Sequence, residues 1–206
     1  MSITTEAELE TAITNWLGGR TDLTARYPEW ITLFEAHAAR RLKVMPMEVQ
    51  TGITFNSGSA ILPTDFLGLK ELLNPNNQPL QYATETYLDG VVGQQTGTSA
   101  YFTIVGDNTV SGTQFLVSYP KQDGSYTITY FAKTPALSGT LNWLFTNFPD
   151  AYLWGALTEA HAFVADDQML AIAKARRDEI MDEVSKLYSV RMSPLGTRIQ
   201  VLGVTP

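Results

Sequence analysis

The stretch from Tyr130 to Tyr188 constrains the fold most, because an aromatic-rich connection there leads into two successive helical patterns. The run NFPD at 147–150 is typical of a helix start. Asn147 can cap the helix, Pro149 suits an early helical position, and Asp150 complements the positive helix end. The apolar residues that follow recur at spacings of three and four, namely Leu153, Ala156, Leu157, Ala160, Phe163 and Val164. This periodicity predicts an amphipathic helix with one buried face.

A second amphipathic run follows the pair Asp166-Asp167, which interrupts the apolar pattern. Its apolar positions are Met169, Ala173, Ile180, Val184 and Leu187, and its mostly outward positions are Asp178, Asp182, Glu183 and Lys186. The two runs predict a helical hairpin, whose apolar faces require partner helices to cover them.

Two N-terminal helices are predicted as those partners. Thr5 and Glu8 form a capping box, and the first helical pattern stops at Gly18-Gly19. Pro28 opens a second helix, which Pro46 ends. If these helices pack on the C-terminal hairpin, each pair buries the apolar face that the other exposes.

Between Met47 and Lys133 the apolar period changes to the alternation of β-strands. Turn residues such as Asn56-Ser57-Gly58 and Asp123-Gly124 separate the alternating runs. Strands are expected at 48–55, 60–62, 66–73, 101–105, 114–118 and 126–132.

The predicted fold class is α+β: a helical bundle formed by the N- and C-terminal helices, with an inserted antiparallel β domain and an extended C-terminal tail. The boundaries are 1–45 for the N-terminal helices, 46–134 for the β-rich domain, 135–188 for the C-terminal helical hairpin and 189–206 for the tail.

Charge and cysteine content exclude several classes of function. The net charge of −7 argues against a fold-wide electrostatic surface for DNA or an anionic membrane. The absence of cysteine excludes thiol catalysis, disulfides and thiolate metal sites. The N-terminus has no signal-peptide pattern, and no apolar run approaches the roughly 20 residues of a membrane span. We therefore expect a soluble protein made in a reducing cytoplasm.

Two groups of titratable residues are candidates for chemistry. His37 and His161 could form a zinc or catalytic site with Glu159 or Asp166, but no predicted helix carries a ligand-spaced pair, so structural histidines are the preferred interpretation. Asp166-Asp167 could act as paired carboxylates, although a loop that caps the second helix is preferred.

The remaining motifs also favour structural interpretations. Neither Ser57-Gly58-Ser59 nor the run at 90–93 matches a phosphate loop. The basic cluster at 174–177 could touch phosphate or an acidic partner, but a solvated helix face balanced by nearby acids is preferred. Five aromatic residues could line a pocket or an interface, but core packing where the β domain meets the helices is preferred; they are Trp143, Phe145, Phe148, Tyr152 and Trp154. No catalytic, cofactor or metal site is predicted.

Several segments in one order span about residues 7–188. They are Ala38-Ala39-Arg40-Arg41-Leu42, Ile61-Leu62-Pro63-Thr64-Asp65-Phe66-Leu67, Tyr119-Pro120, Tyr126-Thr127-Ile128-Thr129-Tyr130-Phe131, Pro135-Ala136-Leu137-Ser138, Asn142-Trp143-Leu144, Phe148-Pro149-Asp150 and Glu159-Ala160. In this order and spacing, the chain resembles the adaptor (head-to-tail connector) proteins that bind beneath the portal of tailed bacteriophages.

The resemblance implies a structural virion protein at the head–tail interface, assembled in the host cytoplasm. It implies a homo-oligomeric ring, of twelve subunits, docked on the portal protein and receiving tail or nozzle proteins below. Genomic DNA would pass through the channel without specific binding. The resemblance carries over no catalytic residue, cofactor or membrane contact.

The predicted tail is too apolar for a solvated linker. Its apolar residues are Val190, Met192, Leu195, Ile199, Val201, Leu202 and Val204, and we expect them to bind the portal. The alternation in Arg198-Ile199-Gln200-Val201 favours an extended strand that either joins a neighbour's sheet edge or lies in a groove.

Two alternative functions come from other classes. The β region with its exposed aromatic residues could form a virion-associated carbohydrate- or receptor-binding module. A carboxylate-based hydrolase using Asp166 or Asp167 is a third, weaker hypothesis.

Overall fold

The structure is a computed structural model that describes residues 3–84, 87–88, 96–107 and 113–192. The chain divides into two compact units. We call Met1–Pro46 together with Thr134–Pro206 the helical unit, and Met47–Lys133 the β unit. Each unit has its own hydrophobic core and is described by itself.

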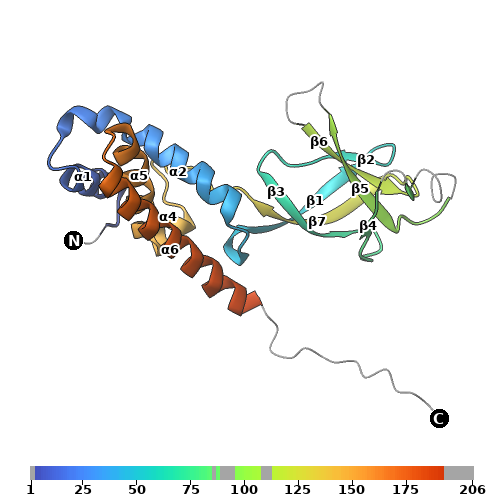
Figure 1. The fold of residues 1–206 in the computed structure, drawn as a ribbon. Coiled ribbons are helices and arrows are strands. Elements are labelled where there is room, and N and C mark those ends of the chain that lie inside the picture. Colours follow the sequence, from blue (N-terminus) through green and yellow to red (C-terminus); the bar gives the residue numbers. More distant parts are fainter. Residues whose placement is uncertain (1–2, 85–86, 89–95, 108–112, 193–206) are drawn as a thin grey trace, which may run out of the picture. The chain divides into compact units, whose positions relative to one another are not determined.

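The helical unit contains five α-helices in its described residues (Figure 1). They are α1 (Glu6–Trp16), α2 (Tyr27–Arg41), α4 (Trp143–Asn147), α5 (Pro149–Phe163) and α6 (Asp167–Met192). A 3-10 helix, η1 (Thr21–Arg26), leads into α2, and a second, η2 (Met45–Met47), lies where the two units meet in the sequence.

The helix starts follow local sequence signals. The predicted capping box is confirmed, because Glu8 N–H donates to Thr5 Oγ1 at 3.2 Å and Thr5 N–H donates to the Glu8 carboxylate at 3.1 Å. Pro149 occupies the start of α5, as predicted. The predicted cap at Asn147 was wrong, since that residue ends the extra helix α4. A different asparagine, Asn142, caps α4 by accepting from Phe145 N–H at 2.9 Å.

Helix α5 is the centre of the helical unit, because α1, α2, α4 and α6 all pack against it. Its buried residues lie on all sides of the helix: Ala151, Tyr152, Leu153, Gly155, Ala156, Leu157, Thr158, Ala160 and His161. A helix that is apolar all round is a core helix, and its small residues let neighbouring helices approach from several directions.

The predicted bundle architecture was wrong, although the class α+β holds. The helices do not form two hairpins that cover each other; they surround α5 instead. The prediction assigned α5 a single buried face, whereas Ala151, Gly155 and Thr158 add further contact surfaces. In α6 the residues buried along the described helix form one narrow stripe, Ala173, Arg177, Met181, Val184 and Tyr188.

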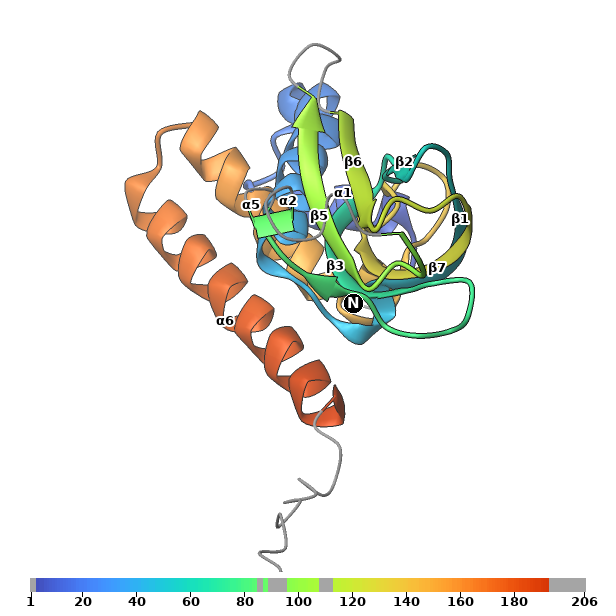
Figure 2. The same cartoon turned by 90° about the vertical axis from the view of Figure 1, so that its right-hand side faces the viewer.

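The predicted start of the extended tail at Ser189 was also wrong, because α6 continues to Met192. Figure 2 shows α6 as one long helix that runs past the end of α5. Residues 193–206 lie outside the described residues.

The β unit contains two sheets, and not all of their strands pair in antiparallel fashion (Figure 2). The first has the order β1 (Glu48–Phe55), β7 (Gly124–Ala132) and β3 (Phe66–Leu73). The second has the order β2 (Ser59–Ile61), β6 (Thr113–Tyr119), β5 (Tyr101–Asp107) and β4 (Gln81–Tyr82). Strand β4 pairs with β5 in parallel, which corrects the expected all-antiparallel arrangement.

The two sheets contribute side chains to one core within the β unit. Phe55 of β1 and Tyr126 of β7 have ring centroids 4.1 Å apart and are both almost fully buried. Other members of this core are Ala60, Leu62, Leu72, Leu80, Phe102, Leu116, Ile128, Tyr130 and Ala132. The alternation of buried residues along β7 places one face of this strand in the core, as its sequence period predicts.

Candidate functional site: polar networks in the helical unit

His161 and Asp166, two of the predicted candidates, lie close together at the end of α5. His161 is only 4% exposed, and its Nδ1 lies 3.8 Å from Asp166 Oδ2. The other carboxylate oxygen, Asp166 Oδ1, accepts from Met169 N–H at 3.1 Å. Asp166 therefore caps α6, which confirms the preferred interpretation of this carboxylate. Asp167 is the exposed first residue of α6.

A hollow of about 470 Å³ lies beside this pair. It is lined by Trp16, Leu17, Arg20, His161, Val164, Asp166 and Met169. Both ring nitrogens of His161 are buried without a hydrogen-bond partner in the described structure. Both nitrogens are buried, which agrees with the preferred interpretation of His161 as a structural histidine.

The second predicted histidine, His37, lies on α2 and does not meet His161 in a shared site. Its Nε2 is buried without a hydrogen-bond partner. Burial lowers the pKa of His37, and the positive charge of Arg177 lowers it further. Within the described ranges, no group of three or more His, Asp or Glu side chains is arranged to hold a metal ion.

The basic cluster at 174–177 is divided between surface and interior. Arg176 is exposed and pairs with Glu179 at 3.1 Å. Arg177 is only 7% exposed and donates to Asp178 Oδ1 from both Nε (3.1 Å) and Nη2 (3.0 Å). The two arginines are therefore balanced by acids on the same helix, as expected, but the burial of Arg177 does not fit the predicted solvated face.

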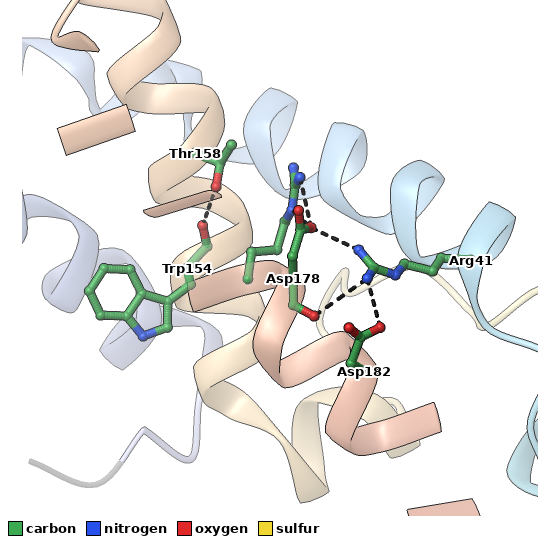
Figure 3. A network of polar contacts seen from close by, with 6 residues as sticks. Arg41, Trp154, Thr158, Asp178 and Asp182 are labelled. Atoms are coloured by element: carbon green, nitrogen blue, oxygen red, sulfur yellow. Dashed lines mark hydrogen bonds and ion pairs between the residues drawn. The ribbon is translucent and has the colours of Figure 1, made fainter. Parts of the chain in front are cut away.

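Arg41 connects α2 to α6 through the most extensive ion-pair network of the helical unit (Figure 3). Its Nη1 lies 2.8 Å from Asp178 Oδ1, and its Nη2 lies 2.7 Å from Asp182 Oδ1. Asp178 thus receives hydrogen bonds from Arg41 and from Arg177 at once. We call these four residues, Arg41, Arg177, Asp178 and Asp182, the α2–α6 network.

The charges of the α2–α6 network stabilise its ionised form. Burial opposes ionisation of Asp178, but the hydrogen bonds and charges of Arg177 and Arg41 outweigh it and lower the pKa of Asp178. The hydrogen bond to Asp182 raises the pKa of Arg41. Asp178 and Arg41 therefore stay charged at neutral pH and hold the two helices by charge-assisted hydrogen bonds.

A second network, which sequence analysis missed, fixes the connection that precedes α4. The Glu35 carboxylate accepts from Leu137 N–H at 2.7 Å and from the Tyr152 hydroxyl at 3.0 Å. Asn142 Nδ2 donates to the same hydroxyl and to Pro135 O, each at 2.7 Å. Burial raises the pKa of Tyr152, so its hydroxyl remains a donor to Glu35. The sequence signal that could have indicated this network is the acidic residue Glu35, which follows the apolar Phe34 directly in the second predicted helix.

The five aromatic residues of the 143–154 stretch pack within the helical unit. Phe145 and Tyr152 are 1% exposed, with ring centroids 5.4 Å apart. Trp143 and Phe148 both contact Tyr188 of α6, and Trp154 contacts Trp16 of α1. Core packing is therefore confirmed for Phe145 and Tyr152, and the ring contacts of the other three lie among the helices of the helical unit.

The remaining candidates fall outside any assembled site. Ser57-Gly58-Ser59 forms a tight turn between β1 and β2, where Gly58 N–H donates to Asp123 Oδ1 at 3.0 Å. The run at 90–93 lies outside the described residues. Of the predicted portal-binding residues, Val190 and Met192 fall in the last turn of α6. The others, Leu195, Ile199, Val201, Leu202 and Val204, lie outside the described residues.

Comparison with known proteins identifies the family. The family model described as SU10 adaptor protein matches residues 4–198, which is nearly the whole chain. The chain belongs to the SU10 adaptor protein family. This confirms the resemblance to bacteriophage adaptor proteins and assigns the chain to a structural class of virion component. A search of curated proteins found no match.

The polar networks of the helical unit agree with the assignment to an adaptor family. These networks join helices to each other and to the 134–142 connection, so they stabilise the architecture of the unit. No helix in the described ranges is long and apolar enough to cross a membrane.

Proposed function

We propose that this chain forms a ring beneath the portal of a tailed bacteriophage and joins the capsid vertex to the tail around the DNA channel. The match to the SU10 adaptor protein family over residues 4–198 carries this proposal. The ring contains twelve copies, contacts the portal on one side and receives tail proteins on the other.

Two structural observations support an architectural role. Two carboxylates of the helical unit have structural partners: Asp166 caps α6, and Asp178 of α6 pairs with Arg41 of α2. The chain also divides into two units with separate cores, which gives one subunit two independent surfaces for different partners.

The C-terminal tail is proposed to join the chain to the portal. The residues assigned to this contact are Val190, Met192, Leu195, Ile199, Val201, Leu202 and Val204. Each aliphatic side chain that becomes buried in a partner contributes about 1.5–3 kcal/mol before the cost of ordering the segment.

The proposal is tested by mixing the purified protein with its portal and imaging the product by electron microscopy. We expect a ring of additional density on one face of the portal, centred on the channel. Portal particles that remain unchanged at saturating protein concentration would refute the adaptor function.

DNA binding gives a second test. Since the chain has 21 acidic against 14 basic residues, duplex DNA should bind weakly and slide through the ring. Tight binding at physiological salt with a steep salt dependence would contradict a passive channel.

A further inference from the structure

The outer edge of β1 is an unprotected strand edge. In the part of the chain that the structure describes, β1 pairs only with β7, and all eight residues stay in regular register. Its only charged residue is Glu48 at its start, which pairs with Lys70. Natural edge strands usually carry charges, prolines or bulges that prevent further pairing.

The opposite edge of the same sheet shows that protection. Strand β3 carries Lys70 and Glu71, and its register with β7 shifts twice, between Phe66 and Gly68 and between Leu69 and Glu71. These irregularities and charges oppose strand addition. The contrast within one three-stranded sheet marks β1 as the edge that is available to a further strand.

A groove of about 560 Å³ runs along this edge. Residues 51–54 of β1 and 59–61 of β2 line it, together with Asn56, Pro63 and Phe115. Because β1 and β2 are the terminal strands of the two sheets, the groove lies between two sheet edges. None of its lining residues is charged, and Ile61 is 63% exposed beside it. The groove therefore suits an extended segment with apolar side chains at alternate positions.

We propose that residues 197–206 of a second copy of this chain occupy the groove as an added strand on β1. Fourteen residues follow Met192 in the sequence, and at about 3.3 Å each they span about 46 Å, enough for a strand the length of β1 and a linker. The pattern Arg198-Ile199-Gln200-Val201 alternates as such a strand requires.

Charge complementarity also favours this occupant. Residues 193–206 contain Arg198 and no acidic residue, whereas residues 47–133 contain seven acidic and three basic residues. The inference rests on the proposed function for the choice of a second copy, because a ring requires a contact between different surfaces of neighbouring subunits. It narrows the proposed portal contact to Val190, Met192 and Leu195, because Ile199, Val201, Leu202 and Val204 would pack against the neighbouring subunit instead.

The natural absence of cysteine allows a direct test by disulfide trapping. One full-length variant carries Thr51→Cys in the groove, and a second carries Val201→Cys in the tail. When the two variants are mixed and oxidised, a covalent heterodimer should form. Its yield should rise with protein concentration and fall when an excess of the cysteine-free chain is added as a competitor. The matched control, Tyr82→Cys, places the thiol on another exposed residue, in β4 and outside the groove, and should give several-fold less heterodimer.

Three results would overturn the inference. They are a heterodimer yield no higher than with Tyr82→Cys, cross-links only between two Thr51→Cys copies, and only intramolecular closure in a chain that carries both substitutions. Because the assay needs no portal, it separates this inference from the proposed function, which fails only if the full-length protein does not assemble on the portal.

A charge placed in the groove gives an independent test of whether the groove is occupied. Ile61→Lys should abolish the cross-link between the two cysteine variants, while Tyr82→Lys should preserve it, and both chains should remain folded because both positions are exposed. A persistent cross-link with Ile61→Lys would contradict occupation of the groove.

Discussion

Gly155 of α5 offers a sharp test of how the helical unit is packed. It lies against the buried Phe34 of α2, and a Cβ built on Gly155 would overlap ring atoms Cδ2 and Cγ of Phe34 and lie 2.7 Å from Cε2. All three approaches are closer than real Cβ contacts allow. Replacement by alanine therefore requires the ring or the helix to move.

Two opposing effects decide the stability of Gly155→Ala. Alanine is the better helix former by about 0.8–1.0 kcal/mol, which favours the variant. Overpacking in a core costs about 1–3 kcal/mol, which opposes it. Phe34 cannot turn away freely, because it is 1% exposed and contacts Tyr152 edge to face at a centroid distance of 5.0 Å. We therefore expect the upper part of the overpacking range, about 2–3 kcal/mol, which leaves a net loss of about 1–2 kcal/mol after the gain in helix propensity.

Urea unfolding followed by tryptophan fluorescence measures this loss for the helical unit alone, because all four tryptophans lie within residues 1–46 and 134–206. The control is Phe34→Leu alone and combined with Gly155→Ala. If the clash is real, the double variant should be more stable than the sum of the two single effects by about 0.5–3 kcal/mol. A Gly155→Ala variant that is more stable than the parent, as helix propensity alone predicts, would refute this packing.

Three further outcomes follow from the helical unit. Arg41→Ala should lower the free energy of unfolding by about 1 kcal/mol, because the acidic partners of Arg41 are partly exposed. Arg20→Ala, which removes an exposed pair, should change it hardly at all in the same fluorescence assay. Equal losses in the two variants would contradict the α2–α6 network. The lowered pKa of His37 means that the unfolded chain binds its proton first, so stability should fall as the pH drops below about 6.5, and His37→Gln should flatten this loss between pH 7 and 5. Leu157→Asp should abolish cooperative unfolding, because Leu157 is fully buried and an unpaired core charge costs several kcal/mol; a soluble, cooperative variant would contradict its burial.

Local signals in the sequence predicted helix starts and strands well, since they depend on neighbouring residues. Thr5 and Glu8 cap α1 through bonds that span three residues, and the alternation along β7 reports burial directly. The arrangement of helices was harder to predict. The spacing of Leu153, Leu157 and Ala160 indicates one buried face, but the burial of Gly155 depends on Phe34, which is distant in the sequence.

The polar networks show the same limit. The pairing of Arg176 and Arg177 with nearby acids could be expected from their spacing on one helix. The ion pair between Arg41 and Asp178 joins residues that are 137 positions apart, and no local sequence pattern predicts it. The role of Glu35 likewise depends on residues distant in the sequence, because Leu137 N–H of the 134–142 connection donates to its carboxylate.

The pairing of cations also bears on the proposed passage of DNA through the ring. Arg20, Arg26, Arg41, Lys70, Arg176 and Arg177 each lie within 3.2 Å of a carboxylate oxygen. A cation that already has an acidic partner gains less from a phosphate, because binding the phosphate disrupts or shares the existing pair. Affinity for duplex DNA grows with the number of phosphates that a protein neutralises, so engaged cations reduce it more than the net charge alone suggests. In the proposed ring, cations that are engaged in this way would retain the genome less strongly, and one of them, Arg41, also joins α2 to α6.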